Sequence, residues 1–215
     1  LFLNSRRAAS ARAPSYATPA MHNPGPPPHA AMHGQDAPSG WITRWAHLVP
    51  PRGHVLDVAC GSGRHLRWFH AHGHAVTGVD RSAEAIAPLA PLGELVHADI
   101  EQGPWPFTGR RFDAVVVTHY LWRPLLPAIA ASVAPGGVLL YETFARGNGT
   151  VGRPSRPEFL LEPGELLAAF PGLRVIAYED GFLPSPERFV QRLAAVRETP
   201  GDRPSHHPLV PPASG

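Results

Sequence analysis

The segment Val55–His65 combines residue types that suit the binding of a nucleotide-like ligand. Its first part, Val55–Ala59, is short and mostly apolar, which is typical of a buried parallel strand. Gly61 and Gly63 follow, and because they lack a Cβ they allow a sharp turn and a close approach of the backbone to a ligand. A helix that begins near Arg64 would direct its free N–H groups at the same place. The pattern therefore predicts a ligand-binding turn between a strand and a helix.

Polar side chains also stand where three further strands are expected to end. Asp80, Asp99 and Thr118 each close a predicted apolar strand. Open α/β sheets bind ligands at the carboxyl ends of their strands, so these side chains are expected to surround the glycine turn. Asp80 lies 19 positions after Gly61, a spacing at which a carboxylate can accept hydrogen bonds from the hydroxyls of a ribose.

Two residues depart from the fingerprint of dinucleotide-binding folds. That fingerprint requires a third glycine at the sixth position of Gly-x-Gly-x-x-Gly, where this chain has Leu66. An acidic residue, Asp57, also stands inside the first strand, four positions before Gly61. These departures disfavour an NAD-dependent oxidoreductase, which remains the alternative enzyme class.

An acidic residue followed after three positions by Gly-x-Gly resembles the first motif of the class I S-adenosylmethionine-dependent methyltransferases. The resemblance extends over about residues 39–198 and, within the class, is loosely similar to small bacterial stand-alone enzymes of the tellurite-resistance type. The matching stretches are VLDVACGSGRH, VTGVD, HADI, FDAVVVTHYL and APGGVLLYETF.

The resemblance implies a doubly wound α/β fold, with a mostly parallel seven-stranded sheet and helices on both faces. It also implies S-adenosylmethionine as the cofactor and transfer of a methyl group to a small-molecule acceptor by in-line displacement, which depends mainly on alignment. A methyltransferase-like domain that binds without catalysing is the second alternative.

The resemblance further assigns roles to residues around the turn. Gly61 and Gly63 would let the backbone pass under the methionine part of the cofactor. Asp57 would interact with the cofactor's ammonium group, directly or through water. Asp80 would accept hydrogen bonds from the two ribose hydroxyls.

The remaining implied site residues follow the third and fourth predicted strands. Asp99 would accept a hydrogen bond from the adenine amino group, and the Ile100 N–H would donate one to a ring nitrogen. Thr118 and His119 would close the pocket near the sulfonium. His119 and Tyr120 are the candidate catalytic residues, His119 as a general base because its ordinary pKa suits proton removal near neutrality. A supporting role for His119 remains equally open.

Other residues have both a structural and a functional interpretation. Trp41 is more typical of core packing, but together with Arg44 it is a candidate for a helix that covers the cofactor. Glu142 either orients a substrate or caps a loop, and Asp113 is interpreted as structural. The long loop 145–164 is expected to cover the acceptor site.

Several chemistries are disfavoured by what the motifs contain. Thr118–Leu121 replaces the Asn/Asp-Pro-Pro-Tyr motif that accompanies methylation of DNA bases or glutamine amides. Cys60 lies within the glycine turn, where a thiol is typical of packing rather than of a cytosine-type nucleophile. His70, His72 and His74 flank a glycine at a helix end, and no metal site is predicted there.

Composition limits the partners. The chain has 19 basic residues, all arginine, and residues 39–198 carry 15 of them against 15 acidic residues. The predicted folded part is therefore neutral, which disfavours nucleic acid as a partner. A single cysteine fits a reducing, cytoplasmic location, and no apolar run reaches the length of a membrane span. A monomer or a homodimer is expected.

The predicted organisation is a disordered leader over residues 1–38, a binding domain over 39–198 and a disordered, Pro-rich tail over 199–215. A fragment, or a start assigned too early, is also consistent with the leader. The expected helices span residues 39–48, 63–72, 82–89, 124–133 and 165–170, and the expected strands span 55–60, 75–80, 95–99, 112–118, 138–143, 173–178 and 189–196.

Overall fold

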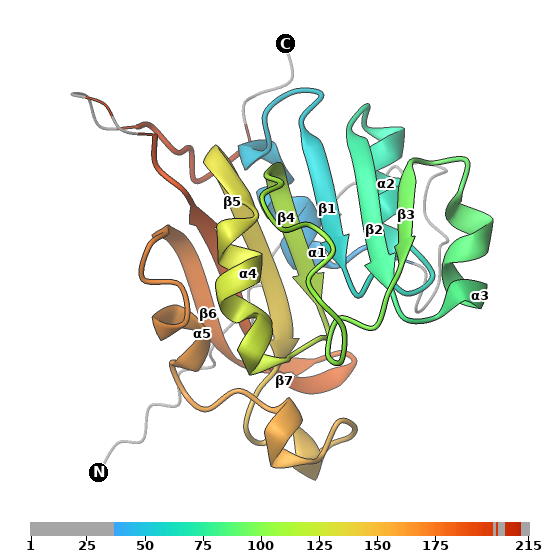
Figure 1. Ribbon diagram of the computed structural model, residues 1–215. Coiled ribbons are helices and arrows are strands. Elements are labelled where there is room, and N and C mark those ends of the chain that lie inside the picture. The colour runs from blue at the N-terminus through green and yellow to red at the C-terminus, as the bar shows by residue number, and fades with distance from the viewer. Residues whose placement is uncertain (1–36, 200, 202–204, 212–215) are drawn as a thin grey trace, which may run out of the picture. The chain divides into compact units, whose positions relative to one another are not determined.

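A single seven-stranded sheet organises the chain in a computed structural model that describes residues 37–199, 201 and 205–211 (Figure 1). The strand order is β3-β2-β1-β4-β5-β7-β6, and only the pairs that involve β7 are antiparallel. The predicted doubly wound α/β class is therefore confirmed. The strands are β1 (His54–Val58), β2 (Ala75–Asp80), β3 (Glu94–His97), β4 (Phe112–Thr118), β5 (Val133–Phe144), β6 (Arg174–Pro184) and β7 (Glu187–Val196).

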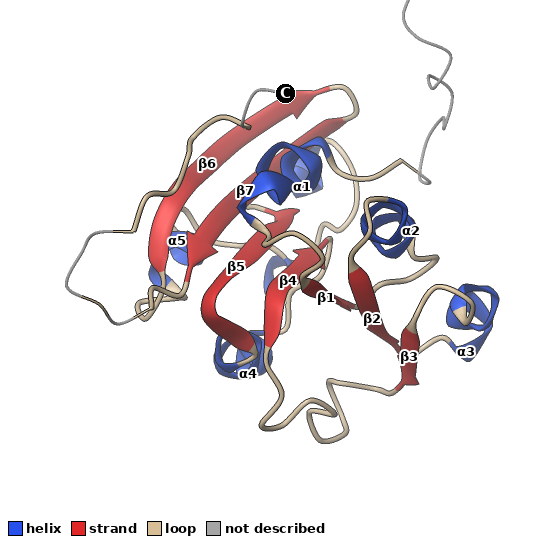
Figure 2. Cartoon of the chain, turned by 90° about the horizontal axis from the view of Figure 1, so that it is seen from above, coloured by secondary structure: helices blue, strands red, loops and turns tan. Residues whose placement is uncertain are grey.

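Helices cover both faces of this sheet (Figure 2). One face carries α1 (Gly40–Trp45), α2 (Arg64–Ala71) and α3 (Ala83–Ile86), and their apolar side chains form one buried cluster with that face. The opposite face carries α4 (Leu126–Ala131) and α5 (Glu165–Ala168), which pack into a second cluster. Short 3-10 turns complete the described part: η2 (Ala46–Leu48), η3 (Ala87–Leu89), η4 (Arg123–Leu125), η5 (Asn148–Thr150) and η6 (Pro157–Phe159).

Strand β1 is apolar on both sides because it lies in the middle of the sheet. It pairs with β2 on one side and with β4 on the other. Val55 packs into the cluster under α1 and α2, whereas Leu56 and Val58 pack into the cluster under α4. All three side chains are fully buried, as expected for a parallel strand covered by helices on both faces.

Two strands are longer than predicted: β6 extends six residues beyond its expected end, and β5 begins five residues before its expected start. Residues 135–137 were expected to form a turn between a helix and a strand. Instead, β5 begins at Val133, and the register jumps so that Val133 lies opposite Phe112 and Val138 opposite Ala114. The Pro-Gly-Gly sequence therefore forms an irregularity within the strand rather than its boundary. Helix α4 accordingly ends at Ala131, earlier than predicted.

The two termini of the chain are described only in part. The predicted leader lies mostly outside the described residues, which begin at Ala37. Within the expected tail, the Pro208 carbonyl oxygen lies 2.9 Å from His47 Nε2. Residues 200, 202–204 and 212–215 lie outside the described part.

We expect Gly63→Ala to destabilise the fold by roughly 2–4 kcal/mol in urea unfolding, because of both backbone strain and overlap. Gly63 has a φ of 75°, and a Cβ there would overlap Leu89 Cδ1 and lie 2.8 Å from Leu89 Cδ2. Gly73→Ala is the matched control: its φ is 82°, but a Cβ would meet no atom within 4 Å. It should cost only about 1–2 kcal/mol. Equal losses would show that Leu89 does not restrict the turn.

Candidate active site

The glycine turn after β1 is tied to the end of β2. Ala59, Gly61 and Gly63 have φ values of 53°, 52° and 75°, so the backbone bends sharply through the left-handed region. The Gly61 N–H donates to Asp80 Oδ2 at 2.7 Å, and the Cys60 N–H donates to the Val79 carbonyl at 3.0 Å. A Cβ at Gly61 would meet no atom within 4 Å, so the backbone is bare on that side.

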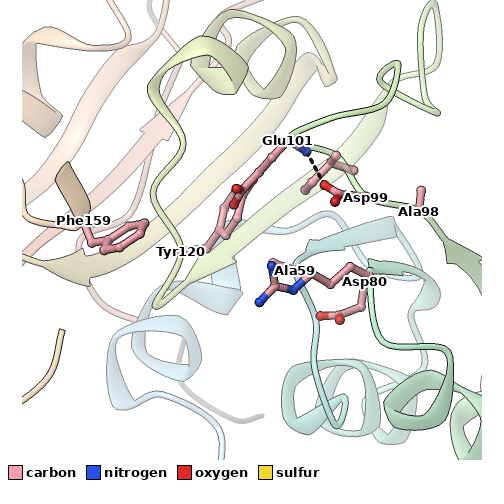
Figure 3. A pocket seen from close by; sticks show the side chains of 9 residues that line it. Ala59, Asp80, Ala98, Asp99, Glu101, Tyr120 and Phe159 are labelled. Carbon is pink, nitrogen blue, oxygen red and sulfur yellow. Dashed lines mark hydrogen bonds between the residues drawn. The ribbon is translucent and has the colours of Figure 1, made fainter. Parts of the chain in front are cut away.

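A cavity of about 240 Å³ adjoins this turn at the carboxyl ends of β1, β2 and β4 (Figure 3). Four predicted site residues line it, namely Asp80, Asp99, Ile100 and Tyr120. In this view Asp80 and Asp99 lie on one side of the Tyr120 ring and Phe159 lies on the other. The strand ends therefore bring together side chains that are separated in sequence.

Both cavity carboxylates are held by backbone donors. Asp80 Oδ1 accepts from the Ser82 N–H at 2.9 Å, in addition to the Gly61 bond to its other oxygen. Asp99 Oδ1 accepts from the Glu101 and Gln102 N–H groups at 2.9 and 3.2 Å. An ionised carboxylate offers about four acceptor positions, so each side chain keeps capacity for ligand donors.

The cavity is also lined by residues that the sequence did not assign to a site, among them Arg81, Glu101 and Phe159. Arg81 directly follows Asp80, and Glu101 lies two positions after Asp99. A site prediction that included the two residues after each strand-end carboxylate would therefore have contained both. Phe159 belongs to the predicted loop 145–164 and is 38% exposed. Its position supports the expectation that this loop reaches the site.

Asp57 lies beneath the turn, and only 1% of its surface is exposed. Its Oδ2 is buried with no hydrogen-bond partner among the described residues, and His65 Nδ1 lies 3.8 Å away. Burial raises the pKa of Asp57 to about 8. Burial also lowers the pKa of His65 to about 3, and His65 Nε2 accepts a hydrogen bond from the Ser39 N–H at 3.1 Å. Both side chains are therefore uncharged at neutral pH.

His119 lies where β4 leaves the sheet, and its side chain is 38% exposed. Its φ is 55°, and its N–H donates to the Glu142 carbonyl at 2.9 Å. The imidazole packs against Phe144 in a tilted arrangement with ring centroids 4.8 Å apart, and its Nε2 lies 3.8 Å from Glu142 Oε1. Burial, followed by the Arg64 charge, lowers the pKa of His119 to about 4, so the ring is neutral at neutral pH. This lowered pKa removes the premise of the predicted general-base role, because His119 does not keep the ordinary pKa that suits proton removal near neutrality.

Glu142 occupies a buried position between His119 and an arginine. Its side chain is 1% exposed, and its Oε2 accepts from Arg192 Nε at 2.6 Å. The pairing of Glu142 with Arg192 across β5 and β7 places the two side chains opposite each other. Glu142 therefore holds an ion pair behind His119 rather than capping a loop.

A second cavity adjoins the first one, and a third cavity shares His119 with the second. The second, of about 260 Å³, is lined by His119, Tyr120, Phe144 and Phe159 among others, and shares Tyr120 with the first cavity. The third, of about 360 Å³, is also lined by His119. The two candidate catalytic residues therefore stand between neighbouring cavities.

Tyr120 carries an unsatisfied hydroxyl. Its Oη is buried with no hydrogen-bond partner among the described residues. Burial and the nearby carboxylates of Glu101 and Asp99 raise the pKa of Tyr120 well above its usual value. The phenol is therefore protonated and can act only as a hydrogen-bonding group at neutral pH.

The structure separates other candidates from the cavities. Trp41 is 2% exposed and donates from Nε1 to the Leu193 carbonyl at 3.2 Å, so it is a core residue. Arg44 instead pairs with Glu179 at 3.1 Å. Asp113 accepts from the His54 N–H at 2.8 Å, which confirms its structural interpretation. Burial raises the pKa of the Cys60 thiol far above its usual range, which disfavours a nucleophilic role.

Thr118, the fourth predicted strand-end residue, contacts an arginine next to the turn. Arg64 Nη2 lies 3.4 Å from Thr118 Oγ1. The first cavity is not lined directly by three predicted site residues, Gly61, Gly63 and Thr118. They adjoin the cavities only through their backbone or through residues next to them in the chain. Among the described residues there is no group of three or more His, Cys, Asp or Glu side chains placed to hold a metal ion. No described helix is both long and apolar enough to span a membrane.

Residues 55–137 match a family described as "Methyltransferase domain". The malonyl-[acyl-carrier protein] O-methyltransferase of Serratia marcescens is 33% identical over 108 residues, which cover 46% of this chain and 41% of the relative. The trans-aconitate 2-methyltransferase of Paracidovorax citrulli is 34% identical over 114 residues, which cover 45% of this chain and 43% of the relative. The match therefore spans less than half the length of these curated relatives.

A solved structure shares the fold. TehB from Haemophilus influenzae superposes with a TM-score of 0.59 at 19% identity, covering 72% of this chain and 60% of that chain. Identity this low establishes similarity of fold alone. The match nevertheless includes strands beyond residues 55–137, because it covers almost three quarters of the chain.

We expect Asp57→Asn to flatten the pH dependence of stability between about pH 4 and 8. The unfolded chain releases the Asp57 proton near the ordinary carboxyl pKa of 3.8, whereas the folded chain keeps it until about pH 8. The folded state therefore binds more protons across this window, and its stability falls as the pH rises. At pH 8 the variant should gain ~2 kcal/mol or more over the parent in urea unfolding. An unchanged pH slope would show that the buried carboxyl is ionised in the folded protein.

Proposed function

We propose that the chain is a class I methyltransferase and that it transfers a methyl group from S-adenosylmethionine to a small-molecule acceptor. The observation that carries the proposal is the convergence of Ala59, at the start of the glycine turn, with Asp80 and Asp99 on one cavity, while Asp80 also holds the Gly61 N–H. The two relatives are named for methylating a malonyl group on a carrier protein and trans-aconitate. Their names support an acceptor of small-molecule type.

The lining of the first cavity fits the adenosine part of the cofactor. A ribose presents two hydroxyl donors, and Asp80 keeps acceptor positions at the end of β2. The adenine amino group is a further donor, and Asp99 stands one strand farther along with one oxygen bound to backbone N–H groups. Ile100 supplies backbone and an apolar wall beside it. We assign these three residues to adenosine binding.

The bare backbone of the turn fits the methionine part. Gly61 and Gly63 leave room above the turn, and the first N–H groups of α2 point toward an anion placed there. Asp57 is too deeply buried for direct contact, so we assign it an indirect role beneath the turn, through the backbone or a water molecule. Thr118 would complete the wall near the sulfonium, beside Arg64.

His119 and Tyr120 stand between the cofactor cavity and the neighbouring cavities. When bound, S-adenosylmethionine supplies a methyl carbon that takes the acceptor's lone pair while the carbon–sulfur pair returns to sulfur, which leaves a neutral thioether. His119 is neutral and can accept a hydrogen bond from an acceptor that carries a proton, but its lowered pKa makes it a weak base at neutral pH. The Tyr120 hydroxyl, which has no described partner, orients the acceptor by hydrogen bonding.

The packing of α2 disfavours the dinucleotide alternative. In dinucleotide folds the third glycine brings the helix close to the sheet. Here Leu66 occupies that position, is fully buried, and contacts β2 at Gly78, where a Cβ would lie 2.7 Å from Leu66 Cδ1. The small residue that lets α2 approach the sheet is therefore Gly78 on β2 rather than a glycine on the helix. This packing differs from that of a dinucleotide-binding turn.

We expect S-adenosylhomocysteine to bind in calorimetric titration, and NAD not to bind. Asp80→Ala should weaken S-adenosylhomocysteine binding by about 2 kcal/mol, or roughly 30-fold, because charge-assisted hydrogen bonds to ribose are lost. Asp80→Asn, which keeps a carbonyl acceptor, should lose less. Asp113→Ala removes a carboxylate bonded to the His54 N–H at the opposite ends of the strands, where β1 and β4 begin, and is the control. Binding of NAD alone, or unchanged affinity in Asp80→Ala, would contradict the proposal.

A further inference from the structure

A cavity of about 360 Å³ lies on the far side of His119 and carries two arginines in its wall. Arg64 is the first residue of α2, and Arg188 lies near the start of β7. Glu142 and the Ser39–Gly40 segment complete much of the remaining lining. The two cations thus reach one cavity from two different elements, α2 and β7.

The carboxylate in this cavity is already engaged. Glu142 Oε2 accepts from Arg192 Nε at 2.6 Å, and Arg192 Nη1 also pairs with Glu179 at 3.1 Å. Neither Arg64 nor Arg188 forms an ion pair within the described part of the chain. The cavity therefore has an excess of positive charge.

The hydrogen bonding of both arginines is also incomplete. Arg64 contacts only the Ala37 carbonyl and Thr118 Oγ1 among described side-chain partners, each at 3.4 Å, beyond the usual range for N–H···O bonds. Arg188 Nε is buried with no partner among the described residues. Because a partly buried guanidinium without an anion costs free energy, the cavity is suited to an anionic ligand.

The electrostatic influence on neighbouring groups agrees with this charge balance. The pKa of His119 is lowered by burial and then by Arg64, against Glu142, and Arg188 acts in the same direction as Arg64. Burial lowers the pKa of Arg64, the carboxyl groups of Glu142 and Asp57 act against this shift, and Arg188 acts with it. At His119 the positive charges of Arg64 and Arg188 therefore outweigh the negative charge of Glu142.

One of the two arginines is explained by the proposed cofactor. Arg64 directly follows the turn over which the methionine part is proposed to lie, so the cofactor's carboxylate can neutralise it. A single carboxylate neutralises a single arginine. Arg188 comes from β7 and is left without an anion.

We infer that Arg188 binds the acid group of the methyl acceptor, which is a small carboxylic acid. This inference rests on the proposed function and specifies its substrate class. A planar guanidinium binds a carboxylate through two parallel hydrogen bonds, which also fixes the orientation of the acid. The neighbouring cavity, which also contains His119, is walled by Leu121, Phe144 and Phe159 and would take the apolar part of the acid.

The test uses benzoate as the probe and the full chain loaded with S-adenosylhomocysteine. Benzoate should bind in the millimolar range expected for so small a ligand, and benzamide, its neutral counterpart, at least ~10-fold more weakly. Arg188→Gln should weaken benzoate binding at least ~10-fold while S-adenosylhomocysteine affinity stays within about threefold. Arg188→Lys keeps the charge and should retain part of the benzoate affinity.

Arg174→Gln is the matched control, because Arg174 pairs with Glu198 at 2.7 Å near the opposite edge of the sheet. It should change neither affinity. Unchanged benzoate binding in Arg188→Gln, equal binding of benzamide, or no saturable benzoate binding would overturn the inference. So would a loss of S-adenosylhomocysteine affinity in Arg188→Gln as large as the loss for benzoate, because Arg188 would then serve the cofactor. Failure of the parent chain to bind S-adenosylhomocysteine would overturn the proposed function first.

Discussion

The hydrogen bond from the Gly61 N–H to the Asp80 carboxylate is the interaction on which the site depends. It joins the turn after β1 to the end of β2 at 2.7 Å, so the two strand ends are fixed relative to each other. The turn passes through the left-handed region even at Ala59, which costs free energy for a residue with a Cβ. The charge-assisted bond offsets this strain and preforms the floor of the cavity before any ligand arrives.

The order of the strands also separates the charges along the ligand-binding edge. Strands β2 and β3, on one side of β1, end near Asp80 and Asp99. On the other side, β7 contributes Arg188, and Arg64 stands at the start of α2. A ligand that lies across β1 therefore meets acceptors at one end and cations at the other. The proposed cofactor has the same polarity, with hydroxyl and amino donors in its nucleoside and a carboxylate in its methionine part.

The sequence predicted this site best where its parts are local. A strand, a glycine turn and an acid at the next strand end follow one another within 30 residues, and parallel strands bring such ends together. The Glu142–Arg192 pair and Arg188 could not be predicted, because they depend on how antiparallel β7 inserts beside β5. The prediction of a turn at residues 135–137 is wrong for a related reason, since it also depends on strand pairing. Pro-Gly-Gly is typical of a turn, but pairing with β4 retains it within a strand.

Because Asp57 is uncharged, it does not cancel the positive charge of Arg64 at the positive end of the site. His65 Nε2 accepts from the Ser39 N–H, so a neutral ring carries its proton on Nδ1, which lies 3.8 Å from Asp57 Oδ2. That distance is too long for a hydrogen bond, and an ionised carboxylate would remain buried without a partner. The folded chain avoids this cost by keeping Asp57 protonated at neutral pH. A protonated Asp57 does not neutralise Arg64, which leaves that arginine available to an anion above the turn.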